Sequence, residues 1–126
     1  ISTKVLTNAQ IGVYTEESLK NLPPLWKERY FTRSGDVYVL GDEIKREVIF
    51  MQMNLMDDFQ FQKPFDLIFC RNVMIYFQQE AKEQLIRKFY RLLKPGGYLF
   101  VGHSETIQRD ASNFRYVEPS IYRKDH

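Results

Sequence analysis

The sequence predicts an α/β fold, in which helices pack outside a sheet, and three features of its second half predict it. Residues 65–70 are a near-continuous apolar run, which is typical of a strand buried on both faces of a parallel sheet. Residues 78–93 have the periodicity of an amphipathic helix. The apolar stripe of this helix consists of Ala81, Leu85, Phe89 and Leu92. A second apolar strand follows at residues 98–101, after a Lys-Pro-Gly-Gly segment that ends the helix. The order strand, helix, strand, with a terminal hairpin after it, indicates an α/β sheet.

The beginning of the chain predicts two short helices. Ser2 is a suitable N-cap for a helix whose apolar face extends to Val13. A second helix is predicted over residues 16–22. The two prolines that follow it would end or redirect it, because proline lacks the amide donor.

The middle of the chain predicts strands. Residues 30–33 and 37–40 are strand-like, and the Ser-Gly-Asp segment between them suits a tight hairpin turn. Residues 48–53 are predicted to form a further strand, which is followed by Asn54 and Leu55.

The composition limits the classes of function. A chain of 126 residues with 44% hydrophobic residues is expected to form a single domain, residues 1–126, around a buried core. Its net charge of +2 makes no case for nucleic-acid binding. No stretch approaches the roughly 18 apolar residues of a membrane span. One cysteine cannot form a disulfide within the chain, which favours a reducing compartment. We therefore expect a cytoplasmic protein without a membrane span.

Thiol and imidazole groups are too few for a common metal site. Cys70, His103 and His126 do not have the spacing of a zinc site, so no metal is expected. A Cys-His hydrolase built from Cys70 and His103 is an alternative. Cys70 lies in a predicted buried strand, however, and buried cysteines are usually inert.

Polar or small residues follow three of the predicted strands. In open α/β sheets, ligands bind beyond the carboxyl ends of the strands, so these residues are candidates for a ligand site. The alternative is that they are ordinary loop residues that cap strands and helices. The candidates are Asn54, Leu55, Arg71, Asn72, Tyr76, Gly102, His103, Ser104 and Glu105.

Two segments, PFDLIFCRNVMIYF and LLKPGGYLFVGHSET, carry a resemblance to a known family. LLKPGG before a strand is widespread among class I methyltransferases, whereas CRNVMIYF is much narrower. Together, at this spacing, they resemble the C-terminal part of the chemotaxis-receptor methyltransferases, the CheR family. The resemblance covers essentially all of the chain. It implies a partial Rossmann-like class I methyltransferase sheet, of strand order 3-2-1-4-5-7-6, that lacks its first two strands. It also implies a small antiparallel β insertion at residues 30–53.

The resemblance implies a protein-glutamate O-methyltransferase. Such enzymes transfer a methyl group from S-adenosylmethionine to glutamate side chains of methyl-accepting chemoreceptors and release S-adenosylhomocysteine. Carried over to this sequence, Asn54 and Leu55 would lie by the adenosine. Arg71 and Asn72 would line the cofactor pocket. Tyr76 would stand near the transferred methyl, and its alternative is core packing. A glutamate, with an ordinary pKa of about 4.3, is ionised at neutral pH, so neither a metal nor a general base is required.

The resemblance also implies that the insertion contacts the receptor. Arg33, Lys45 and Arg46 are basic, and the methylated helices of receptors are rich in glutamate, so opposite charge would speed docking. A solvated hairpin face explains the same charges equally well. Some members of the family use this insertion to hold a C-terminal receptor pentapeptide. The short Ser-Gly-Asp turn here does not match their longer loop.

One part of the family pattern has no counterpart in this chain. None of the six glycines belongs to a glycine-rich loop after a first strand, where backbone must approach the cofactor closely. We therefore expect half of the cofactor pocket to be lacking and the isolated chain to be inactive. Its exposed strand edges would favour self-association. The alternative functions are a non-catalytic receptor- or partner-binding module of the same family, and a class I methyltransferase that acts on a small molecule.

Overall fold

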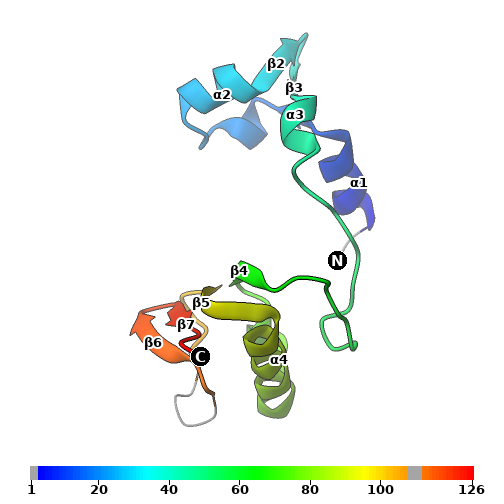
Figure 1. Ribbon diagram of the computed structural model, residues 1–126. Coiled ribbons are helices and arrows are strands. Elements are labelled where there is room, and N and C mark those ends of the chain that lie inside the picture. The colour runs from blue at the N-terminus through cyan, green and yellow to red at the C-terminus, as the bar shows by residue number, and fades with distance from the viewer. Residues whose placement is uncertain (1–2, 108–111) are drawn as a thin grey trace. The chain divides into compact units, whose positions relative to one another are not determined.

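The computed structural model describes residues 3–107 and 112–126, so the predicted N-cap Ser2 lies outside the described residues. The chain divides into two compact units, Ile1–Asn54 and Leu55–His126, and Figure 1 shows the elements of each. No helix in the described ranges has the length and apolar character needed to cross a bilayer.

The first unit is built from short elements. In chain order they are α1 (Thr3–Ile11), β1 (Val13–Thr15), η1 (Glu17–Leu19), α2 (Pro24–Tyr30), β2 (Phe31–Ser34), β3 (Val37–Leu40) and α3 (Asp42–Lys45). Gly12 ends α1 with a φ of +73°, a left-handed conformation that favours glycine. The predicted first helix is therefore confirmed up to Ile11, whereas Val13 begins a strand.

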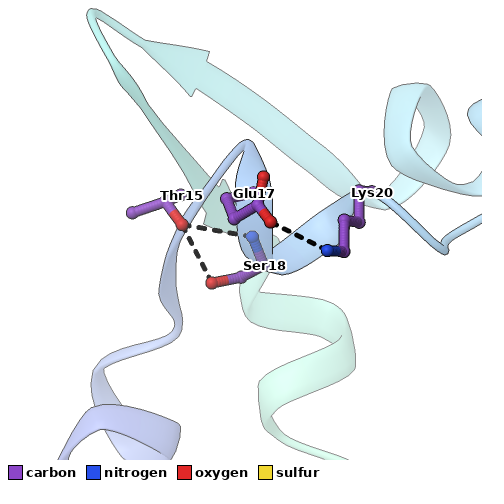
Figure 2. A network of polar contacts seen from close by, with 4 residues as sticks. All are labelled: Thr15, Glu17, Ser18 and Lys20. Carbon is purple, nitrogen blue, oxygen red and sulfur yellow. Dashed lines mark hydrogen bonds and ion pairs between the residues drawn. The ribbon is translucent and has the colours of Figure 1, made fainter.

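The second predicted helix, over residues 16–22, is wrong in its extent. Only the 3-10 turn η1 forms there, and Leu19 is its buried side chain. Figure 2 shows how the turn is held: the Thr15 hydroxyl accepts the amide of Ser18 at 3.2 Å, and Lys20 pairs with Glu17 at 2.8 Å. Pro24 does not end a helix but starts α2, because its missing N–H falls in the first turn, where it would have no partner in the helix.

A three-stranded antiparallel sheet of order β1-β3-β2 forms in the first unit. The predicted hairpin is confirmed: β2 and β3 pair from Phe31 opposite Leu40 to Ser34 opposite Val37. Gly35 takes a φ of +61° in the turn between them. The strand β1, which the sequence did not predict, pairs with the other side of β3.

The predicted strand at residues 48–53 is wrong. These residues have no regular secondary structure, and the side chain of Ile49 is 82% exposed. The physical reason is that a strand needs a neighbour for its N–H and C=O groups. Neither sheet in the described part of the chain provides one.

The second unit holds a four-stranded mixed sheet. Its elements are β4 (Phe65–Cys70), η2 (Met74–Tyr76), α4 (Gln79–Leu92), β5 (Leu93–Val101), β6 (Arg115–Glu118) and β7 (Ile121–Arg123). The strand order is β4-β5-β7-β6, with β4 and β5 parallel and the other pairs antiparallel. The α/β prediction is confirmed, and the order agrees with the last four strands, 4-5-7-6, that the family resemblance implies.

The core of this unit lies between α4 and one face of the sheet. Its members include Leu85, Ile86 and Phe89 of α4, and Leu99 and Val101 of β5. The helix has a strong apolar stripe, as the sequence predicted, and ends where β5 begins at Leu93.

The expectation that β4 is buried on both faces is wrong for the described residues. Ile68 and Cys70 pack into the core, but Leu67 is 47% and Phe69 is 65% exposed. Phe69 stacks on Phe100 of the neighbouring strand, with ring centroids 4.7 Å apart. Successive side chains of a strand point to opposite faces, so one apolar face of this sheet remains open to solvent.

Candidate functional site

Two loops leave the sheet at the same edge. The strands β4 and β5 are parallel neighbours, and Cys70 at the end of β4 is in register with Val101 at the end of β5. The loop that starts at Arg71 and the loop that starts at Gly102 therefore emerge side by side. This is the edge of a parallel sheet at which ligands bind.

Glu105 joins these two loops. Its side chain is 2% exposed. The oxygen Oε1 accepts hydrogen bonds from the backbone N–H groups of Asn72, at 2.6 Å, and Gly102, at 2.9 Å. The oxygen Oε2 accepts one from the N–H of Met74, at 2.7 Å. One carboxylate thus binds backbone donors from both loops, which are about thirty residues apart in the chain.

The charge of Glu105 is maintained by these donors. Burial by itself would raise the pKa of Glu105. The hydrogen bonds from backbone N–H groups to the carboxylate have the opposite and larger effect, and they hold the pKa below its ordinary value. The carboxylate is therefore ionised at neutral pH. Charge-assisted hydrogen bonds of this kind are stronger than neutral ones.

Asn72 and Gly102 approach each other closely at the junction of the loops. Asn72 has a φ of +60°, a conformation that asparagine tolerates better than most residues. A Cβ atom added at Gly102 would lie 2.5 Å from Oδ1 of Asn72 and 2.8 Å from Oε1 of Glu105. A glycine is therefore required at this position by the space available.

The first loop presents polar side chains to solvent. Arg71 and Asn72 are exposed, and Tyr76 is 83% exposed, so the ring of Tyr76 is not part of the core. Met74, between them, is only 1% exposed and anchors the loop in the core. The loop therefore offers a guanidinium, an amide and a phenol, and these groups fit a ligand that carries a carboxylate and a cation.

Two further residues predicted to bind the cofactor lie where the two units join in the sequence. Asn54 is the last residue of the first unit, and Leu55 is the first of the second. Leu55 packs against the core of the second unit. Lys88 of α4 donates to the backbone carbonyls of Leu55, at 3.3 Å, and Asp57, at 2.6 Å.

The three residues predicted to contact a receptor lie in the first unit. Arg33 is on β2 and donates to the carbonyl of Gly35 at 3.2 Å, while Lys45 donates to the carbonyl of Ile11 at 3.0 Å. Lys45 and Arg46 line a pocket of about 510 Å³, and Arg33 is not among its lining residues. These cations are therefore not gathered in one pocket.

The thiol chemistry considered for Cys70 has no support in its surroundings. Burial first, and then the negative charge of Glu105, raise the pKa of the Cys70 thiol to about 11. A thiol with this pKa is protonated at neutral pH and is a poor nucleophile. Within the described residues, no three or more His, Cys, Asp or Glu side chains gather as a metal would require.

Glu105 is the residue of this site whose role the sequence did not reveal. Its position beyond a strand made it a candidate to face a ligand, whereas the structure turns its carboxylate inward. The available signal was its spacing: an acid three residues after a glycine that directly follows a strand can fold back onto that glycine's amide.

The fold and the loops define an α/β domain with a candidate ligand site beyond two parallel strands. A family model described as CheR methyltransferase, SAM binding domain, matches residues 1–123. The chain therefore belongs to this family, and the resemblance found in the sequence is confirmed.

Individual relatives agree with the family. The chain is 44% identical to a chemotaxis protein methyltransferase of Borreliella burgdorferi over 99% of its own length and 44% of the relative's. It is 40% identical to that of Escherichia coli, over 97% of this chain and 44% of the relative. It is 39% identical to chemotaxis protein methyltransferase 2 of Vibrio cholerae, over 100% of this chain and 46% of the relative. The chain thus spans slightly less than half the length of these relatives.

Proposed function

We propose that this chain is part of an S-adenosylmethionine-dependent methyltransferase of chemotaxis, acting in the cytoplasm. The observation that carries the proposal is the family match over residues 1–123, together with an exposed Arg71–Asn72–Tyr76 loop beyond a parallel strand. Its substrates would be glutamate side chains of methyl-accepting chemoreceptors, which become methyl esters.

The chemistry asks little of the protein beyond alignment. When bound, S-adenosylmethionine supplies an electrophilic methyl group on a cationic sulfur and leaves as S-adenosylhomocysteine. A receptor glutamate is ionised at neutral pH and is already a nucleophile, so the protein needs no general base and no metal for this step. Holding the reacting groups in line is proximity catalysis.

The residues of the first loop would bind and orient. The Arg71 guanidinium suits a carboxylate, and the Asn72 amide both donates and accepts hydrogen bonds, so this pair would hold the cofactor. The Tyr76 ring or hydroxyl would stand near the sulfonium, because an electron-rich group favours a neighbouring cation. Asn54 and Leu55 would lie by the adenosine.

The first unit would contact the receptor. Its hairpin carries Arg33, α3 carries Lys45 and the C-cap of α3 is Arg46; the positive charge of these residues suits a glutamate-rich helix. Complementary charge would act mainly on the rate of association.

The cofactor pocket of this segment is proposed to be completed by other parts of the enzyme. A four-stranded sheet with β4 at its edge and Phe69 exposed is consistent with further strands beside it. The isolated segment would then be inactive.

The proposal is tested with the protein at its natural length. Incubated with tritiated S-adenosylmethionine and receptor membranes, it should place base-labile label in the receptors. Asn72→Ala should weaken cofactor binding by about 1–3 kcal/mol, the cost of an unpaired polar partner. Asn21→Ala, an exposed asparagine of the first unit, is the matched control and should bind normally. Absence of label from receptors, or equal affinity of both variants by calorimetry, would refute the proposal.

A further inference from the structure

The contacts of Glu105 suggest a role beyond stability. Backbone amides after β4 and β5 that are buried must find an acceptor, because an unpaired buried N–H is costly. For the amides of Asn72, Met74 and Gly102 this acceptor is a side chain of the second loop, the carboxylate of Glu105. All three donate to it over 2.6–2.9 Å.

These bonds act on the segment that carries the candidate ligand residues. Glu105 accepts hydrogen bonds from the amide of Asn72 and from that of Met74, two residues later in the first loop. The Met74 side chain is also buried in the core. The backbone between Asn72 and Met74 is thereby held in the left-handed conformation of Asn72, with a φ of +60°. The directions of the Arg71, Asn72 and Tyr76 side chains follow from this backbone.

We propose that Glu105 is a positioning residue, which holds the loop after β4 against the end of β5 so that Arg71, Asn72 and Tyr76 point to the ligand. The inference rests on the proposed function and names a residue that acts through others. Glu105 is 2% exposed and so does not itself reach a ligand.

The geometry distinguishes the two carboxylate oxygens. Oε1 accepts hydrogen bonds from the amides of Asn72 and Gly102, one from each loop, and Oε2 accepts one from the amide of Met74, while the amide of Val73 also lowers the pKa of the carboxylate. In Glu105→Gln, we expect the side-chain oxygen to take the place of Oε1, because that oxygen joins the two loops. The NH2 group would then face the N–H of Met74, a donor against a donor. The variant should therefore release Met74 while keeping Asn72 and Gly102 bound.

The experiment uses the protein at its natural length and compares Glu105→Gln with the wild type. Amide hydrogen exchange should accelerate at Met74 more than at Asn72 or Gly102. Affinity for S-adenosylmethionine should fall about tenfold or more, since bonds to a charged group are among the stronger ones. Glu105→Ala should lose all three bonds and bind more weakly still.

A control separates positioning from general stability. Ile86→Val and Leu85→Ala remove core contacts on α4 but none of the hydrogen bonds of Glu105. The matched control is the core variant whose melting temperature falls by the same amount as that of Glu105→Gln. Its affinity for the cofactor, measured well below the melting temperature, should equal that of the wild type.

The two proposals fail in different ways. If the wild-type protein does not bind S-adenosylmethionine, the proposed function is refuted. If the wild type binds and Glu105→Gln binds equally well, or loses no more affinity than its matched core control, the positioning role is refuted. Uniform exchange at the three amides in Glu105→Gln would also contradict the assignment of the two oxygens.

Discussion

A methyl group added at Gly102 tests the junction of the two loops. The Cβ of Gly102→Ala would lie 2.5 Å from Oδ1 of Asn72, 2.8 Å from Oε1 of Glu105 and 3.0 Å from the backbone N of Asn72. The Asn72 side chain could turn away. The other two atoms are joined by a hydrogen bond of 2.6 Å inside the structure and cannot move apart without breaking it.

The expected cost follows from this crowding. Inserting a group into a packed site typically costs about 1–3 kcal/mol, because the neighbours must shift. Gly102 does not have a positive φ, so the alanine backbone itself is not strained. The loss therefore measures the fit between the two loops. Since the shift displaces Asn72, cofactor affinity should fall together with the free energy of unfolding.

Denaturant unfolding of the protein at its natural length measures the effect. Gly41→Ala is the matched control, because its added Cβ would meet nothing closer than 3.4 Å and its φ is not positive. That variant should change the free energy of unfolding by less than about 1 kcal/mol, because the lower entropy of the unfolded alanine chain opposes the loss of a glycine N-cap on α3. If Gly102→Ala is as stable as the wild type and binds S-adenosylmethionine normally, the close approach of the loops is not a feature of the protein in solution.

Four further predictions follow from the site and the surface. Tyr76→Phe should lower turnover while leaving cofactor affinity near normal, because the hydroxyl acts on alignment; wild-type turnover in the methyl-transfer assay would remove Tyr76 from the mechanism. Reversing the charge of Arg33 and Arg46 should slow receptor methylation by an amount that shrinks with added salt, whereas reversing Arg87 on α4 should not; a loss independent of salt would contradict docking by charge. The pKa of Glu105 is lower in the folded state than its ordinary value, so its contribution to stability is full above the ordinary value and is lost as the pH falls through the folded pKa. Thermal melts over this acid range should show the loss, and Glu105→Gln should show less of it; identical profiles would contradict the assignment. The isolated segment should self-associate through the edge of β4 and the apolar face beside it. Light scattering gives its size and titration with S-adenosylmethionine gives its affinity. A monomer that binds the cofactor would refute both the self-association and the proposed incompleteness of the cofactor pocket.

The elements that the sequence could predict are those with a strong local pattern. The strand Phe65–Cys70 has the predicted bounds, because its apolar run is bounded by polar residues and proline. The helix Gln79–Leu92 differs from the prediction by one residue at each end, because its apolar stripe recurs at the helical period. The family motifs lie in the same stretch of chain. These motifs were sufficient to identify the family, because a motif such as CRNVMIYF is recognised from its residues alone, without the contacts that they make.

Residues 48–53 show where local pattern misleads. Their apolar character matches a strand, but strand formation depends on a partner for the backbone. The partner must come from elsewhere in the chain. In the described structure no strand lies beside them, and Ile49 is 82% exposed. The same dependence explains β1, whose three residues are a strand because β3 pairs with them.

The sequence by itself determined which residues follow the strands, and thus that Arg71, Asn72, Tyr76 and Glu105 belong to loops at one edge of the sheet. Only the tertiary structure decided which of them are exposed to solvent and which turn inward. The amides that Glu105 accepts lie up to 33 residues away in the chain, and a contact at that separation exists only once β4 and β5 are paired in register. The free-energy cost of burying a carboxylate is then offset by donors that no local pattern contains.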